Sequence, residues 1–71
     1  MLKGYTWYKR EQAREFAPIV SCYALQLRDT SGDTCPGYYY CGRFYCGQID
    51  ITDAVSEWMI PSYGENVKPN N

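Results

Sequence analysis

The chain has 71 residues, of which 45% are hydrophobic, 17% aromatic and 21% charged, and its formal net charge is −1. This apolar content excludes a wholly disordered chain, and 71 residues are enough for one small domain that buries only about 60% of its unfolded surface. A net charge this close to zero excludes both a strongly basic nucleic-acid-binding protein and an acidic DNA mimic.

The start of the chain shows no targeting signal. It opens on a methionine, and the next twenty residues contain no long apolar stretch. Neither a secretory signal peptide nor a membrane span is therefore predicted. We expect a cytoplasmic protein without membrane association, whose four cysteines stay reduced.

Two elements are predicted before residue 19. The first nine residues alternate loosely between apolar and polar, which is compatible with a short N-terminal strand. Residues 9–17, KREQAREFA, are rich in good helix formers and place their small and apolar side chains on one stripe, which predicts a short amphipathic helix. Pro18 should end this helix, because the residue before a proline is pushed out of the helical region.

A β-hairpin is predicted next. Residues 19–28 alternate between apolar and polar, as in a half-buried strand. The turn-rich segment DTSGDTCPG follows, and residues 37–48 then form the second strand. A turn centred on Ser31-Gly32 pairs residues whose numbers sum to 63. The competing geometry is a tight hairpin across Gly42-Arg43, which would set Tyr40 against Tyr45.

The register of the long hairpin decides which side chains face the core. A slip of one residue would exchange the two sides. The predicted core side carries Tyr23, Leu25, Tyr38, Tyr40 and Phe44. The predicted solvent side carries Tyr39, Cys41, Arg43 and Tyr45.

The segment DITDAVSEWMI predicts a second helix over residues 51–60. Asp50 or Thr52 can cap its start, an apolar stripe includes Val55 and Trp58, and Pro61 ends it. The remaining residues are polar and contain glycine and proline, so 64–71 are expected to form a flexible tail. The whole is predicted to be one compact α+β domain over 1–63, with an antiparallel hairpin sheet, an N-terminal third strand and two short helices.

The four cysteines allow three states. A zinc-binding domain with four cysteine ligands would need all of them to converge, although their spacing lacks two close pairs. A disulfide could join Cys22 to Cys41, or Cys35 to Cys46. We favour free thiols, because unpaired cysteine is commonly buried, and we expect no metal and no cofactor.

No set of residues suggests catalysis. The chain has no histidine, and the nearest pair of carboxylates, Asp50 and Asp53, is explained by capping of the predicted helix. There is also no glycine-rich loop that could hold a phosphate. A non-enzymatic protein is therefore expected.

The segment CPGYYYCGRFYCG carries the best candidate for a functional surface. Helices can cover only one side of this aromatic ribbon, so Tyr39, Arg43 and Tyr45 should stay exposed together, with Tyr38 and Phe44 as alternates in a shifted register. Tyrosine and arginine are enriched at protein interfaces. The alternatives are a homodimer interface and a stacking platform for single-stranded nucleic acid, the latter disfavoured by the lack of positive charge.

In its small size and high tyrosine content the chain resembles the very small proteins of phages and mobile elements. Such proteins commonly block a host enzyme or an immune complex by steric occupation, as anti-CRISPR proteins do. This similarity concerns a class and no sequence motif. It implies a non-enzymatic, anti-defence-like inhibitor that binds another protein or a protein–nucleic acid complex in the host cytoplasm.

Overall fold

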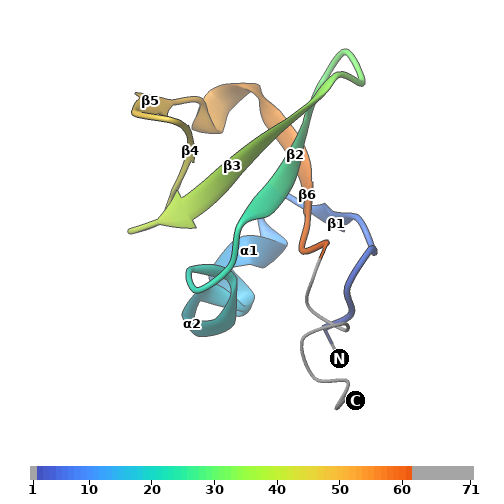
Figure 1. The fold of residues 1–71 in the computed structure, drawn as a ribbon, viewed down its shortest axis with the longest axis vertical. Coiled ribbons are helices and arrows are strands. Elements are labelled where there is room, and N and C mark those ends of the chain that lie inside the picture. The colour runs from blue at the N-terminus through green and yellow to red at the C-terminus, as the bar shows by residue number, and fades with distance from the viewer. Residues whose placement is uncertain (1, 62–71) are drawn as a thin grey trace.

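The computed structural model describes residues 2–61, and these form mainly β structure with little helix. Six antiparallel strands make one sheet in the order β1-β6-β2-β3-β4-β5. Figure 1 shows both helices on the same side of this sheet. The elements in chain order are β1 (Tyr8–Lys9), α1 (Gln12–Glu15), α2 (Ala17–Val20), β2 (Leu25–Asp29), β3 (Thr34–Tyr40), β4 (Arg43–Cys46), β5 (Ile49–Asp50), η1 (Thr52–Ala54, a 3-10 turn) and β6 (Val55–Met59).

The predicted antiparallel sheet, its N-terminal strand and the presence of short helices are confirmed, but the predicted balance of helix and strand is wrong. Within the described part of the chain, strands outnumber helices and each α-helix is a single turn. No helix there is long and apolar enough to cross a membrane. The predicted tail, 64–71, and the predicted domain end at residue 63 lie outside the described residues.

The predicted helix over 9–17 is broken into two. The backbone leaves helical geometry at Phe16, with φ −107° and ψ 22°. Pro18 does not end the helix; it lies in the first turn of α2, where a missing N–H costs nothing. Residues 19 and 20 consequently belong to α2, and β2 begins only at Leu25.

The second predicted helix, 51–60, is wrong: only η1 is helical, and the rest is strand β6. This strand lies between β1 and β2, with Trp58 paired to Tyr8 on one side and to Leu27 on the other. The pairing slips where β2 ends, because Arg28 faces Glu57 whereas the next residue faces Val55. One extra residue on β6 is therefore accommodated as a β-bulge.

The long hairpin forms, but its register differs by one residue from the predicted register. Leu25 faces Gly37, so paired numbers sum to 62. The loop has three residues, with Gly32 at φ +97° and its N–H donating to the Asp29 carbonyl at 3.0 Å. The Asp29 carboxylate accepts hydrogen bonds from Ser31 and Asp33, which lower the pKa of Asp29 and hold the loop.

The predicted strand 37–48 is itself a hairpin. β3 and β4 are joined by Cys41 and Gly42, whose positive φ angles of 50° and 82° match a type I′ turn. Tyr40 faces Arg43 and Tyr38 faces Tyr45. A second hairpin therefore coexists with the long one, but its turn is Cys41-Gly42 and not the predicted Gly42-Arg43, so the predicted pairing of Tyr40 with Tyr45 is wrong. β3 pairs with β2 along its first half and with β4 along its second.

Trp58 lies at the centre of the core and has no exposed surface. Its ring stacks on Tyr8 with centroids 4.9 Å apart and meets Phe16 edge-on at 6.5 Å. Its Nε1–H donates to the Lys9 carbonyl oxygen at 2.9 Å, so the buried indole is satisfied. The buried hydrophobic residues are Leu2, Ala13, Val20, Leu25, Leu27, Tyr39, Phe44, Val55, Trp58 and Ile60.

Candidate functional site

The β3–β4 hairpin presents an aromatic surface away from the core, which we call the outer tyrosine face. It consists of Tyr38 and Tyr40 on β3 with Arg43 and Tyr45 on β4. Directly paired residues in an antiparallel sheet share a side, and the observed pairs are Tyr38 with Tyr45 and Tyr40 with Arg43. The tight turn at the hairpin tip thus brings all four side chains together.

The rings of this face are held in place to different degrees. Tyr38 and Tyr45 stack with centroids 5.3 Å apart and planes 13° apart. The Tyr38 hydroxyl also donates to the Gly47 carbonyl at 2.8 Å, so this ring is fixed at both ends. Tyr40 is the most exposed member, at 61%, against 39% for Tyr38. The face therefore combines a preorganised pair with one protruding ring.

The charge of Arg43 is balanced within the protein. Its Nε donates to Asp50 Oδ2 on β5 at 2.8 Å, and both side chains remain well exposed. The hydrogen bond from Arg43, together with hydrogen bonds from Thr52, lowers the pKa of Asp50 to about 2. The outer tyrosine face consequently has no net positive charge to offer a polyanion.

Two predicted site residues are not on this face. Tyr39 is only 5% exposed and Phe44 only 1%, and their rings pack against each other on the core side at 4.8 Å. The predicted exposure of Tyr39 is wrong because the three-residue loop shifts the register by one and turns alternate side chains over. The same shift brings Tyr38 and Tyr40 out of the predicted core, whereas Phe44 lies inside as expected.

Tyr40 was missed as a site residue because its exposure depends on the length of the loop before β3, for which the sequence carries only a partial signal. A glycine at the third position of a three-residue loop is the pattern of a type I turn followed by a left-handed residue, and Gly32 fits it. Arg43 is exposed and Tyr45 half-buried beside it. Whether any of these residues contacts a partner stays a prediction.

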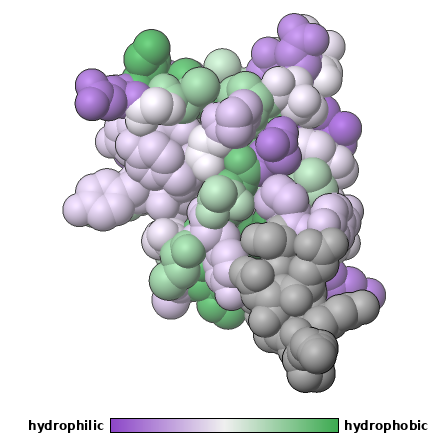
Figure 2. Space-filling view, viewed as in Figure 1, coloured by the Kyte–Doolittle hydropathy of each residue, from purple (hydrophilic) through white to green (hydrophobic). Residues whose placement is uncertain are grey.

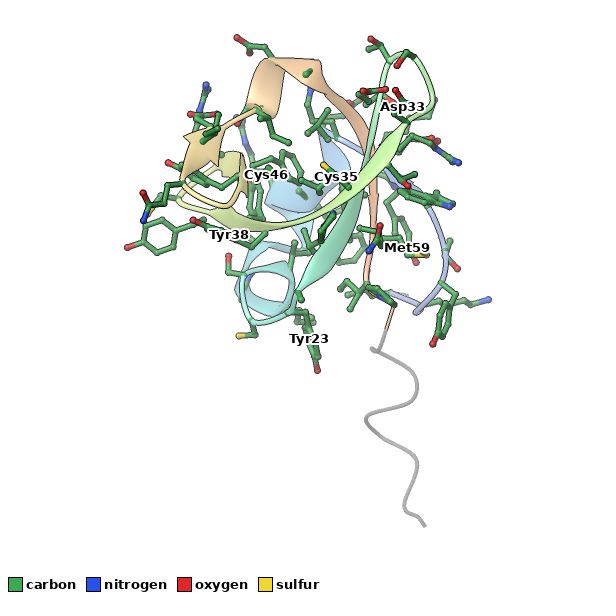
Figure 3. All side chains as sticks on the ribbon, turned by 45° about the horizontal axis from the view of Figure 1, so that its top comes forward. Tyr23, Asp33, Cys35, Tyr38, Cys46 and Met59 are labelled. Atoms are coloured by element: carbon green, nitrogen blue, oxygen red, sulfur yellow. The ribbon has the colours of Figure 1, made fainter. Side chains whose placement is uncertain are left out.

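The four cysteines do not converge. Cys22 and Cys41 are exposed free thiols, with Cys22 Sγ donating to the Pro18 carbonyl at 3.3 Å. Because β2 begins only at Leu25, Cys22 does not face Cys41 across the hairpin, and the alternative of a disulfide between them is not observed. Cys35 and Cys46 are half-buried neighbours, as Figure 3 shows, and both are free thiols. Burial, and then Cys46, raises the pKa of the Cys35 thiol. Among residues 2–61 no three metal-binding side chains gather, so the four-cysteine zinc arrangement has no geometric support.

The surface where β3 and β4 meet is weakly hydrophilic in Figure 2, which suits tyrosine better than a purely aliphatic patch. Tyrosine offers an apolar ring together with a hydroxyl that can donate and accept. Comparisons with protein-family models, with curated proteins and with solved structures gave no match. The functional interpretation therefore depends on the geometry of the chain itself.

Proposed function

We propose that this protein is a non-catalytic binding module that docks onto another protein through the outer tyrosine face and occludes the surface it covers. The observation that carries the proposal is the protruding Tyr40 ring, 61% exposed, beside the fixed Tyr38–Tyr45 pair and Arg43. Large aromatic side chains and arginine dominate the energetic centres of protein interfaces. Rings that are already held in position also lose less entropy on binding.

The charges favour a protein partner over a nucleic acid. Binding to a phosphate backbone depends on unpaired cations, and the single arginine of the face is bonded to Asp50. A complementary protein surface needs an apolar pocket for Tyr40 and hydrogen-bond acceptors for the phenol hydroxyls and the remaining guanidinium donors. An inhibitor that acts by steric occupation requires nothing more than such a surface.

The experiment compares the wild-type chain with Tyr40→Ala and with Tyr5→Ala as the matched control. Tyr5 precedes β1, is 57% exposed and lies outside the face. Each protein is immobilised, its fold is checked by circular dichroism, and captured proteins from an extract of the native host are quantified. The retained partner is then purified for affinity measurement and for a test of whether the module blocks its activity.

Loss of a hot-spot tyrosine typically costs about 2 kcal/mol or more, which is about a 30-fold loss of affinity. We expect this loss for Tyr40→Ala and an affinity within twofold of wild type for Tyr5→Ala. Equal capture by both variants would contradict the assignment of the face. If light scattering detects a dimer and Tyr40→Ala dissociates it, the face would be assigned to self-association. A salt-sensitive complex with single-stranded oligonucleotides would assign the face to nucleic-acid binding.

A further inference from the structure

A cleft of about 330 Å³ lies between the start of α1 and the tip of the β3–β4 hairpin. Its walls carry three arginines, Arg10 and Arg14 from the helical segment and Arg43 from β4, together with Glu11 and Tyr39. This concentration of cations stands out in a chain whose formal net charge is −1. Arg43 also belongs to the outer tyrosine face, but neither the core nor that face accounts for Arg10 and Arg14.

The cleft is rich in guanidinium groups, although nearby carboxylates balance their charge. Its three arginines face Glu11 in the wall and Asp50 and Asp53 near Arg43, so the local charges sum to 3 − 3 = 0. Within residues 2–61 the Arg14 side chain makes no hydrogen bond or ion pair, and the Arg10 side chain donates only to the Thr52 carbonyl, at 3.2 Å. Since each guanidinium has five donors, most of the donors around the cleft are unused.

Tyr39 supplies a second and independent indication of a ligand. Its side chain is 5% exposed and forms part of the cleft wall. Within the described part of the chain its hydroxyl has no hydrogen-bond partner, whereas buried polar groups are nearly always paired. An acceptor atom bound in the cleft would satisfy this donor.

We propose that the cleft binds phosphate, either as the free ion or as a monoester. The donors approach from the helical segment, from β4 and from Tyr39, an arrangement that suits a group with several oxygen atoms pointing in different directions. Arginine forks bind phosphate oxygens in pairs, and a charged donor strengthens each bond. The proposal does not depend on a protein partner at the outer tyrosine face.

The test titrates the full chain with inorganic phosphate at constant ionic strength, with amide chemical shifts as the readout. Arg14→Gln removes an unpaired guanidinium, and Tyr39→Phe removes only the hydroxyl. Lys3→Gln is the matched control, because it removes one positive charge from an exposed residue that does not line the cleft. Acetate serves as the carboxylate probe, and O-phosphoserine and adenosine monophosphate serve as the two monoester probes.

For the wild-type chain we expect amide chemical shifts at the cleft that saturate with phosphate. Phosphate should bind about tenfold more weakly to Arg14→Gln and about threefold more weakly to Tyr39→Phe, whereas the affinity of Lys3→Gln should change less than twofold. Tyr39→Phe should also unfold at the same or a higher urea concentration than wild type, because it removes an unsatisfied buried hydroxyl. Tighter binding of either monoester than of the free ion supports the monoester form, and the reverse order supports the free ion. The proposal would be overturned if the phosphate shifts did not saturate, or if Arg14→Gln and Lys3→Gln lost the same affinity. It would also be overturned if acetate bound as tightly as phosphate, or if Tyr39→Phe were less stable than wild type.

Discussion

Gly37→Ala should destabilise the protein strongly, because a side chain at Gly37 on β3 would meet atoms of both β2 and β4. A Cβ at this position would stand 2.5 Å from Leu27 Cδ1 and closer still to the Tyr45 carbonyl oxygen. Carbon atoms normally touch at about 3.5–4.0 Å, so a neighbouring strand would have to move by about 1 Å. Leu27 is fully buried and a backbone carbonyl cannot rotate away as a side chain can. We therefore expect a cost near the upper end of the overpacking range, about 3 kcal/mol.

Urea unfolding followed by circular dichroism would measure this loss, and thermal unfolding should show a fall in Tm of about 12–24 °C for a domain of this size. Two controls separate the causes. Gly47→Ala places alanine at φ +65° in open space, so it reports backbone strain alone, about 1–2 kcal/mol. Thr34→Ala changes an exposed residue on the same strand. A Gly37→Ala loss no larger than that of Gly47→Ala would refute the close approach and the register that produces it.

Two further measurements test the site and the cysteines. The pKa of Asp50 is lowered to about 2, chiefly by Arg43, against about 3.9 in an unfolded chain, so its stabilising effect is present above pH 4 and is lost as the pH falls from 4 toward 2. Urea midpoints of Asp50→Asn should lack this part of the acid dependence, and a profile parallel to wild type would contradict the ion pair. In a thiol-reagent time course at pH 8 we expect two fast and two slow cysteines, because exposure speeds the reaction, partial burial slows it and the raised pKa of the Cys35 thiol slows that residue further. Four equal rates would contradict the structure, in which the fast pair is Cys22 and Cys41 and the slow pair is Cys35 and Cys46.

The positions of the turns were predicted from the sequence better than the type of secondary structure between them. Val55 and Trp58 are three residues apart, a spacing that indicates one face of a helix. In the structure the extra residue at the bulge shifts the alternation of β6, so both side chains point into the core of a sheet. Ser56 occupies the bulge, its hydroxyl 3.4 Å from two carbonyl oxygens of β2. A bulge depends on the partner strand, and a pattern confined to one segment cannot reveal it.

The location of the candidate site in the chain was predicted, but the side of the sheet on which its tyrosine side chains lie was not. The aromatic segment, the long hairpin that contains it and the exposure of Arg43 were all predicted from the sequence. The length of the preceding loop was not, because Asp, Ser and Gly favour two-residue and three-residue loops alike. The choice between them is made by Asp29, whose carboxylate accepts hydrogen bonds from both Ser31 and Asp33 across the loop. That local contact decides the side on which every tyrosine of β3 emerges.

The two proposed sites use opposite sides of the same two strands. Tyr40 points outward from β3 and Tyr39 points inward toward the cleft, while Arg43 borders both. Tyr40→Ala therefore tests partner binding without touching the cleft wall, and Tyr39→Phe tests phosphate binding without altering the outer surface. Because Arg43 is held by Asp50 at a fixed place between them, phosphate in the cleft would compete with Asp50 for its guanidinium. Filling the cleft would thereby change the charge that the outer tyrosine face presents to a partner.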